Sequence, residues 1–336
     1  MARQLTFGLG RNDRTQAIID GSIALADCEV IIDRSPHEEL FRLALDEQRH
    51  DVTELSLANY TMLRSAKGCG YVALPVFTSR MFRHAAIYVR DDRGVQVPGD
   101  LNGKTLGLRE FSNTATVTAK GLLSDDYGVK QESIVWRVGR VNRGEQAPIL
   151  RRIPADVSAR PIGPDENLSD LLALGELDGV VAYDPPACFL EGRPHVRRLF
   201  PDHARAERDY FSRTRIFPIM HLIVIRRSLA DDGALCAQIC DAFEVAKRLA
   251  FEDLCNPRAL PIMLPWLEQA IAQAQEILGA DYWPYGVDVN RAALSATTRW
   301  LWEQKLIDAP IEPDRLFAPS ILNWRPQHAA VVATTN

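Results

Sequence analysis

The segment from Pro75 to Val89 reads PVFTSRMFRHAAIYV, and it places basic side chains directly before a strand-like run. A second segment at residues 217–227, FPIMHLIVIRR, has a histidine, then β-branched residues that favour strands, and then basic residues. Two such strands, far apart in the sequence, are typical of a chain that leaves one domain and later returns to it. We therefore predict a discontinuous domain I at residues 1–92 and 220–336, with domain II inserted at residues 93–219.

The length and the order of the elements favour this division. A chain of 336 residues exceeds the usual size of one domain. In the first 76 residues, strand patterns alternate with helix patterns, which indicates an α/β fold with a mostly parallel sheet. We expect strands at 4–9, 29–33, 51–57 and 71–76, and helices at 10–21, 36–48 and 60–65.

The composition narrows the class of partner. The net charge of −5 argues against a nucleic-acid partner, which usually requires a basic surface. No run of 18 uninterrupted apolar residues is present, so we expect no membrane partner. Residues 1–9 already read as a strand and lack the pattern of a signal peptide, which predicts a cytoplasmic location unless a signal peptide has been removed.

Common catalytic and metal-binding motifs are absent from the sequence. It contains no phosphate-binding glycine loop, no dinucleotide fingerprint, no nucleophile elbow and no H-E-x-x-H motif. None of the six cysteines forms a C-x-x-C pair, so we expect six reduced, buried thiols and no metal site. The polar residues that do stand out are two histidines and several arginines, which we expect to line a cleft. Such a cleft suits a small dianion, either in a binding protein or in an enzyme.

Several polar residues stand where an anion would bind. Arg11 and Arg14 lie at the start of the helix at 10–21, and helix N-termini attract anions, although a solvated helix end has the same sequence. Ser56 and Asn59 follow the strand at 51–57, and open α/β sheets bind ligands beyond the carboxyl ends of their strands.

Domain II offers three further candidates. Asn113 and Thr114 begin a helix, and they fit an anion site and a plain helix cap equally well. Asp184 ends a buried strand directly before Pro185 and Pro186, which fix the backbone. It is therefore a candidate site residue, with a turn-capping aspartate as the alternative.

From Leu5 to Asn290, the chain resembles the 4,5-dihydroxyphthalate decarboxylase family. The most specific segments are GRNDR at 10–14, ELSLAN at 54–59, residues 75–89, DYFSRTRIFPIMHLIVIRR at 209–227, and WPYG at 283–286. The resemblance implies a type 2 periplasmic-binding-protein-like fold. In such a fold each domain is a mixed sheet flanked by helices, and the site lies in the interdomain cleft. It also implies a carboxy-lyase of phthalate degradation, which converts 4,5-dihydroxyphthalate to protocatechuate and CO2 without a cofactor.

This reaction needs a base near a ring hydroxyl and an acid near the carbon that loses its carboxylate. Because the ring accepts and returns the electrons itself, neither pyridoxal, thiamine nor a metal is required. Our hypothesis assigns proton transfer to His84 and His221, since histidine exchanges protons near neutral pH, and makes Asp184 their partner.

The remaining assignments concern the two carboxylates and the ring of the substrate. An arginine side chain can donate two parallel hydrogen bonds to one carboxylate. We therefore expect Arg80, together with Arg11 or Arg14, to hold the two carboxylates of the substrate. Tyr285 is expected to stack on the ring or hydrogen-bond to it. Since neighbours alternate along a strand, Arg83 should point away from the side that His84 faces.

Other functions on the same fold stay open at this point. A solute-binding protein would use the same cleft without chemistry, and a different small-molecule enzyme would carry different cleft residues. The substrate is expected to be a small aromatic dicarboxylate, or a related hydroxylated aromatic acid. Apolar helices after Leu264 suggest a homo-oligomer.

Overall fold

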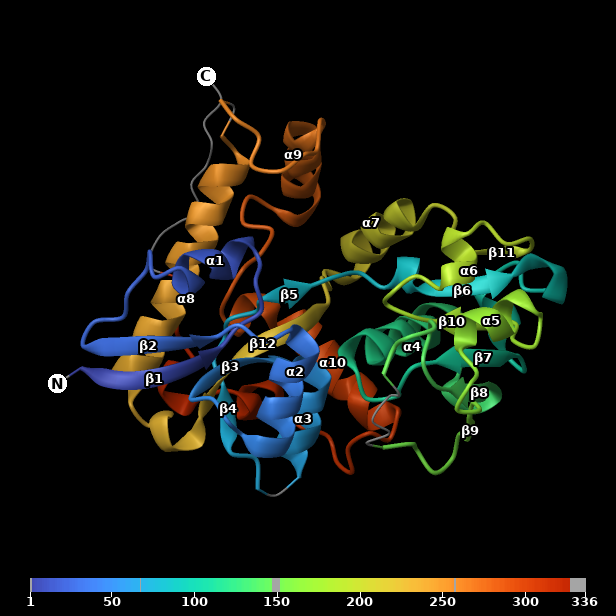
Figure 1. The fold of residues 1–336 in the computed structure, drawn as a ribbon, viewed down its shortest axis with the longest axis horizontal. Helices are drawn as coiled ribbons and strands as arrows, with labels where there is room; N and C mark the ends of the chain where they lie inside the picture. The colour runs from blue at the N-terminus through green and yellow to red at the C-terminus, as the bar shows by residue number, and fades with distance from the viewer. Residues whose placement is uncertain (1, 67, 147–151, 257, 327–336) are drawn as a thin grey trace. The chain divides into compact units, whose positions relative to one another are not determined.

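The computed structural model describes residues 2–66, 68–146, 152–256 and 258–326 (Figure 1). The chain forms two compact units, each built around its own sheet. Unit 1 contains the residues up to Arg80, Ile219–Leu294, and those from Glu312 on; unit 2 contains Met81–Pro218 and Ser295–Ile311.

The sheet of unit 1 has the strand order β2-β1-β3-β12-β4, and β5 also pairs with β12. Strands β1, β2 and β3 run parallel, while β12 runs antiparallel to β3, β4 and β5. The sheet is therefore mixed. Its strands are β1 (Arg3–Gly8), β2 (Cys28–Asp33), β3 (Val52–Ser56), β4 (Tyr71–Ala73), β5 (Ser79–Arg80) and β12 (Ile219–Arg226).

The helices of unit 1 are α1 (Asp13–Ile19), α2 (His37–Arg42), α3 (Leu57–Ser65), α8 (Gly233–Leu254) and α9 (Leu267–Leu278), and α10 (Arg291–Glu303) begins in it. A π-helical turn, Leu43–Glu47, continues α2. In α8, Leu235, Ile239 and Phe243 are buried at helical spacing, so one face of this amphipathic helix packs against the core. Asp232 caps α8 by accepting a hydrogen bond of 3.0 Å from the backbone N–H of Leu235.

The sheet of unit 2 has the order β11-β6-β10-β7-β8-β9. Strands β7 to β10 are parallel, and β6 runs antiparallel to both of its neighbours. The strands are β6 (Ile87–Arg90), β7 (Thr105–Leu108), β8 (Val135–Val138), β9 (Ser158–Pro161), β10 (Gly179–Val181) and β11 (Val196–Arg198). The helices are α4 (Thr114–Tyr127), α5 (Leu168–Ala173), α6 (Ala187–Leu190) and α7 (His203–Thr214).

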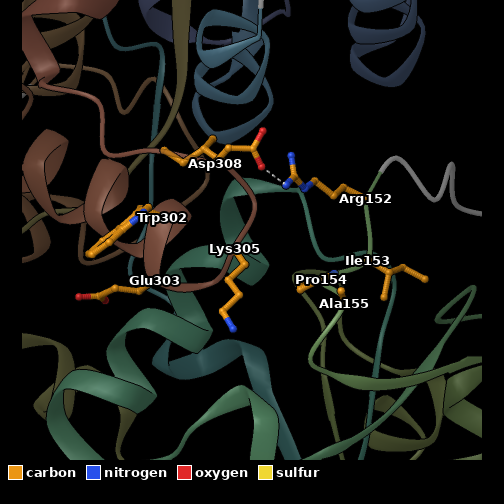
Figure 2. A pocket seen from close by; sticks show the side chains of 9 residues that line it. Arg152, Ile153, Pro154, Ala155, Trp302, Glu303, Lys305 and Asp308 are labelled. Atoms are coloured by element: carbon orange, nitrogen blue, oxygen red, sulfur yellow. Dashed lines mark hydrogen bonds and ion pairs between the residues drawn. The ribbon is translucent and has the colours of Figure 1, made fainter.

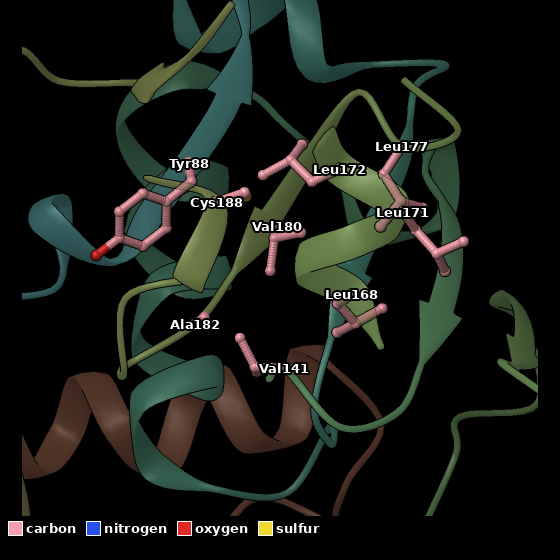
Figure 3. Packing of buried hydrophobic residues seen from close by; sticks show 9 residues of the cluster. All are labelled: Tyr88, Val141, Leu168, Leu171, Leu172, Leu177, Val180, Ala182 and Cys188. Atoms are coloured by element: carbon pink, nitrogen blue, oxygen red, sulfur yellow. The ribbon is translucent and has the colours of Figure 1, made fainter. Parts of the chain in front are cut away.

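Figure 3 shows part of the core of unit 2, where apolar side chains from β6, β10, α5 and α6 pack together. Cys188 lies in this cluster as a small buried residue. The prediction that all six cysteines are buried is wrong for Cys255, which is exposed, and for Cys28, which is half-buried. Cys255 follows the last turn of α8, and Cys28 lies on the edge strand β2, so neither is covered on all sides.

The segment before β6 differs from the prediction. Residues 84–86 form a 3-10 turn, so the strand begins only at Ile87. We expected side chains to alternate along a strand here, so that Arg83 would point away from the side that His84 faces. Because the strand begins only after these residues, that alternation does not apply, and both side chains are buried. Because β6 pairs with β10 and β11, the chain enters unit 2 after Arg80, earlier than the expected boundary at residues 92/93.

Short 3-10 turns occupy Asp91–Arg93, Pro98–Leu101, Gln131–Ser133, Arg227–Leu229, Asp288–Asn290, Pro313–Leu316 and Pro319–Ile321. The stretch at 142–164 contains β9, and its residues 147–151 lie outside the described part of the chain. Among the described residues, no helix combines the length and the apolar character that a membrane span requires.

Candidate active site

A buried carboxylate in unit 1 lies between two histidines. The side chain of Glu54 is 1% exposed, and its Oε1 atom lies 2.8 Å from Nδ1 of His221. Its Oε2 atom lies 3.3 Å from Nε2 of His37 and accepts a hydrogen bond of 3.2 Å from the backbone N–H of Gly10. We call His37, Glu54 and His221 the Glu54 cluster.

The strand register explains why His221 reaches Glu54. Glu54 and Ser56 are two residues apart in β3, so they point to the same face of the sheet. His221 stands opposite Ser56 in the antiparallel pair of β3 and β12, and residues directly opposite each other share a face. The cluster therefore lies where β3 ends, which is the edge at which open α/β sheets bind ligands.

The helix α2 supplies the second histidine. His37 is its first residue, and Phe41 lies one turn further along. The ring of Phe41 packs edge-on against His221, with 4.9 Å between the ring centroids. These contacts hold the two imidazoles on either side of the same carboxylate.

The cluster keeps Glu54 ionised. Burial alone would raise the pKa of this carboxyl group, but the hydrogen bonds with His221 and His37 outweigh it and hold the pKa well below its usual range. The hydrogen bond to Glu54 in turn raises the pKa of His37, against the effect of partial burial. The buried carboxylate and the imidazole of His37 therefore each favour the charged form of the other.

Both imidazoles remain accessible. The side chain of His221 is 25% exposed and that of His37 is 42% exposed. Among the described residues, neither His221 Nε2 nor His37 Nδ1 forms a hydrogen bond. Each ring therefore has one nitrogen engaged by Glu54 and one nitrogen left for a ligand.

Two predicted residues directly follow Glu54 in the sequence. Ser56 is buried and caps α3, because its Oγ atom accepts a hydrogen bond of 3.4 Å from the backbone N–H of Asn59. The Oδ1 atom of Asn59 is buried and accepts no hydrogen bond from the described residues. The β3–α3 junction thus leaves one amide oxygen without a partner.

The two arginines predicted near the start of the first helix have partial protein partners, and only Arg14 lies in α1. Arg14 donates from Nε to the carbonyl oxygen of Thr78 at 2.7 Å, and its guanidinium lies 4.4 Å from the ring centroid of Trp283. Arg11 is exposed, and its Nε atom donates to the side chain of Gln16 at 3.0 Å. Arg11 is therefore the more accessible of the two cations.

Arg80 and Tyr285 are buried in the same unit. Arg80 is 5% exposed, and it donates to the carbonyl oxygen of Pro284 at 2.7 Å and to the side chain of Asn290. Tyr285 is 1% exposed. These contacts let Arg80 hold the aromatic turn that contains Tyr285, and the role of both residues in substrate binding stays a prediction.

His84 lies in unit 2, in surroundings unlike those of His221. Its side chain is 1% exposed, and neither ring nitrogen has a hydrogen-bond partner among the described residues. The ring packs edge-on against Phe200 and Tyr210, with centroid distances of 5.2 and 5.3 Å. Burial lowers the pKa of His84 to about 4, so the imidazole is neutral at pH 7.

The other candidates of unit 2 are more exposed or lie at a helix start. Asp184 is exposed. Burial lowers the pKa of Arg83 to about 10, and the negative charge of Asp184 acts in the opposite direction. Asn113 caps α4, accepting a hydrogen bond of 2.7 Å from the backbone N–H of Thr116. Thr114 is the buried first residue of that helix.

The start of α4 also leaves polar groups without partners. Ser112 is 1% exposed, and its Oγ atom has no hydrogen-bond partner among the described residues. The same is true of Nδ2 of Asn113. The helix cap is therefore present, and unused donors beside it remain available to an anion.

Two groups of side chains have donor atoms close enough to hold a metal ion. In the Glu54 cluster, one ligand atom from each of the three residues lies within 4.8 Å of the other two. Two imidazoles and a carboxylate with an open side suit zinc or another divalent transition metal. The second group, Asp91, Asp92 and His195, lies exposed on unit 2.

Glu54 and His37 are functional candidates that our reading of the sequence missed. Three separate elements bring the cluster together, so no local spacing indicates it. One signal is present nonetheless, since Glu54 is an acid inside the otherwise apolar or uncharged strand VTELS, all five residues of which are buried. A charged residue that is fully buried requires a partner.

A separate pocket of about 670 Å³ lies within unit 2 (Figure 2). None of the predicted site residues lines it. Of its charged side chains, Arg152 pairs with Asp308 at 2.6 Å, and Lys305 pairs with Asp156. Because these cations already have anionic partners, we do not assign a ligand to this pocket.

The two units together have the fold of periplasmic-binding-protein-like α/β proteins. The periplasmic aliphatic sulphonate binding protein of Escherichia coli aligns with a TM-score of 0.54 at 15% identity, over 100% of this chain and 99% of that one. The alkanesulfonate-binding protein of Xanthomonas axonopodis pv. citri, bound to MOPS, gives 0.51 at 16% identity, over 95% and 99% of the chains. No protein-family model matches the chain.

Curated sequences identify the family within this class. The 4,5-dihydroxyphthalate decarboxylase of Comamonas testosteroni is 34% identical over 321 residues, which cover 95% of this chain and 97% of that protein. The enzyme of the same name from Pseudomonas putida is 36% identical over 208 residues, 62% of this chain and 81% of that protein. The chain therefore belongs to the 4,5-dihydroxyphthalate decarboxylase family, a family of carboxy-lyases, as the resemblance predicted.

Proposed function

We propose that this protein converts 4,5-dihydroxyphthalate to protocatechuate and CO2, and that the Glu54 cluster is where protons move. Family membership supports the reaction class. The observation that carries the proposal is a fully buried carboxylate that fixes an accessible imidazole, with 2.8 Å between Glu54 Oε1 and His221 Nδ1.

The electronic demand of the reaction defines what His221 must do. Each carboxylate of the substrate has a ring hydroxyl para to it, and removing the hydroxyl proton sends electron density to the carbon that bears the carboxylate. That carbon then accepts a proton, and the bond to the carboxylate breaks, returning its electron pair to the ring and releasing CO2. The first step needs a base with a free lone pair.

Glu54 prepares His221 for this step. When Nδ1 of His221 carries its proton toward Glu54, Nε2 is the nitrogen with the lone pair. The carboxylate then stabilises the imidazolium that forms once Nε2 has accepted the hydroxyl proton. A buried anion does this more effectively than a solvated one, because little water screens it.

Other predicted residues serve binding in this proposal. Asn59 retains a buried amide oxygen that suits a substrate hydroxyl, and Arg11 retains an exposed guanidinium that suits a carboxylate. For unit 2, the unused donors at Ser112 and Asn113 support carboxylate binding at the start of α4. Proton transfer by His84 with Asp184, which we expected from the sequence, forms no part of this proposal, because both ring nitrogens of His84 are buried.

The test is to mix the purified protein with 4,5-dihydroxyphthalate and to follow CO2 and protocatechuate. We expect turnover that His221→Gln reduces at least about a hundredfold, because general bases contribute about 10²–10⁴ in rate. A matched control is His195→Asn, which removes an exposed histidine paired with Asp91 at 3.0 Å. Asparagine tolerates the positive φ of 67° at residue 195.

Tight binding of the substrate by the unaltered protein, without release of CO2, would favour the alternative of a solute-binding protein. Full turnover by His221→Gln would remove His221 from the reaction and leave the family membership intact. A cytoplasmic location and self-association stay predictions of the same proposal.

A further inference from the structure

The two imidazoles of the Glu54 cluster share one carboxylate but differ in their surroundings. The nitrogen–oxygen distance is 2.8 Å for His221 and 3.3 Å for His37, and the ring of His37 is the more exposed. The ring centroids lie 5.8 Å apart, and the rings are tilted by 44°. The cluster therefore holds two separate proton carriers within reach of one aromatic ring.

Charge compensation favours one extra proton shared by the two rings. Glu54 is buried, and besides the imidazoles only the backbone N–H of Gly10 donates to it among the described residues. With both rings neutral, the buried carboxylate lacks a counter-cation, and with both protonated the cluster carries an excess positive charge. A buried charge without compensation is costly, so one imidazolium beside one neutral imidazole is the favoured state.

His37 is the better placed of the two rings to carry this proton. Its side chain is 42% exposed, so water can hydrate the cation while Nε2 stays 3.3 Å from Glu54. His221 is the less exposed ring, and Phe41 covers one edge of it. The cluster thus contains an acid and a base at the same time, each with one nitrogen directed away from Glu54.

We propose that His37 is the general acid of the decarboxylation, which protonates the ring carbon from Nδ1 while His221 accepts the proton of the para hydroxyl. This assignment rests on the proposed function. His37 gives its proton to the carbon, the bond between that carbon and the carboxylate breaks, and its electron pair restores the aromatic ring as CO2 leaves. The hydroxyl proton returns from His221 to the phenolate oxygen.

The protons balance in this scheme. One substrate carboxylate leaves as CO2, and the proton from His37 takes its place on the ring. His37 ends the cycle neutral and must take up a proton from water before the next turnover. Its exposure permits this, whereas a fully buried acid would need a relay.

Replacing His37 tests the assignment. We expect His37→Gln to lower kcat at least about a hundredfold with KM changed by less than about threefold, since the acid acts only as the carbon gains its proton. In His37→Gly, the exposed position leaves room for imidazole and methylated imidazoles added to the solution. Rescue of kcat should then increase with the acid strength of the added imidazolium, which a merely structural role would not produce.

Several outcomes would overturn the inference. If kcat of His37→Gln stays within about threefold of the unaltered enzyme, another group delivers the proton. The same conclusion follows if no added imidazolium restores kcat in His37→Gly. A rise in KM at constant kcat assigns His37 to binding. If the unaltered protein releases no CO2 from 4,5-dihydroxyphthalate, the proposed function fails instead, so the two failures are distinguishable.

Discussion

Gly10 lies so close to His37 that a Cβ atom at residue 10 would stand 1.8 Å from Nε2 of the imidazole. The same glycine donates its backbone N–H to Glu54. A residue without a side chain is therefore what lets His37 approach the buried carboxylate.

Gly10→Ala tests this relationship without removing a titratable group. We expect the added methyl group to push His37 away from Glu54, and kcat to fall at least about tenfold, which corresponds to about 1.4 kcal/mol of transition-state stabilisation. The control is Gly99→Ala, since a Cβ there meets nothing within 4 Å. Unchanged kinetics of Gly10→Ala would mean that the contact between Gly10 and His37 has no part in the reaction.

Glu54→Gln keeps the shape of the side chain but removes its charge. We expect a fall in kcat of about a hundredfold or more, because an amide neither fixes the tautomer of His221 nor stabilises its imidazolium. Asp33→Asn is the matched control, since Asp33 lies 2.9 Å from Nε2 of another buried histidine, His50, in the same unit. Kinetic and thermal-unfolding measurements on both variants separate loss of chemistry from loss of stability.

If Asp33→Asn lowers kcat as strongly as Glu54→Gln does, the special role of Glu54 is contradicted. We expect Asp33→Asn to act on stability alone. The pKa of Asp33 is lowered to about 2, where burial is outweighed by hydrogen bonds with Ser35 and His50. Its ionised form therefore stabilises the fold above the usual carboxyl pKa of 3.8, and this contribution is lost as the pH falls toward 2.

His84 should make the fold sensitive to mild acid. Its pKa is about 4 in the folded protein and 6.5 in the unfolded chain, so the unfolded state binds the proton more tightly. The free energy of unfolding should decrease as the pH falls from 6.5 toward 4, by up to about 3 kcal/mol from this residue alone. Denaturant unfolding of the unaltered protein and of His84→Phe at pH 7 and pH 4.5 measures the difference.

The same variant addresses the predicted catalytic role of His84. We expect His84→Phe to keep kcat within about threefold, because the buried ring presents no accessible nitrogen. A hundredfold loss with an intact fold would restore His84 as a candidate acid or base, and an unchanged acid sensitivity would contradict the pKa argument.

Removal of metal ions should leave turnover unchanged. The proposed chemistry uses only proton transfer, although the donor atoms of His37, Glu54 and His221 suit a divalent cation. The measurement is kcat after dialysis against a chelator, together with the metal content of the protein. The expectation would be contradicted if turnover is lost after dialysis and returns when zinc or manganese is added. A metal ion, and not shared protons, would then link the three side chains of the cluster.

Much of the fold was predictable because its signals are local. The alternation of strands and helices in residues 4–76 gave β1 to β4 and α1 to α3 within a few residues. The long helix α8 carries a local signal of the same kind, apolar residues at helical spacing. The short strands β5 and β11 were missed, since their residues, SR and VRR, include a single apolar side chain and lack the apolar run that marks β4.

The site was predictable only in part. His221 could be found because it precedes a β-branched run, but its partner Glu54 is 167 residues away in the sequence. His84 has the same kind of flanking sequence, yet it folds into an aromatic cluster, since a 3-10 turn breaks the strand there. Local pattern identifies a histidine before a strand, whereas its environment depends on contacts between distant segments.

The insertion of unit 2 between β5 and β12 has a consequence for synthesis of the protein. His37 and Glu54 leave the ribosome early, but His221 follows the whole segment Met81–Pro218. A nascent chain that stops before β12 thus carries a carboxylate with one imidazole and no partner strand for the end of β3. The complete set of three residues first exists when the ribosome has released β12, so partial products of translation are expected to be inert.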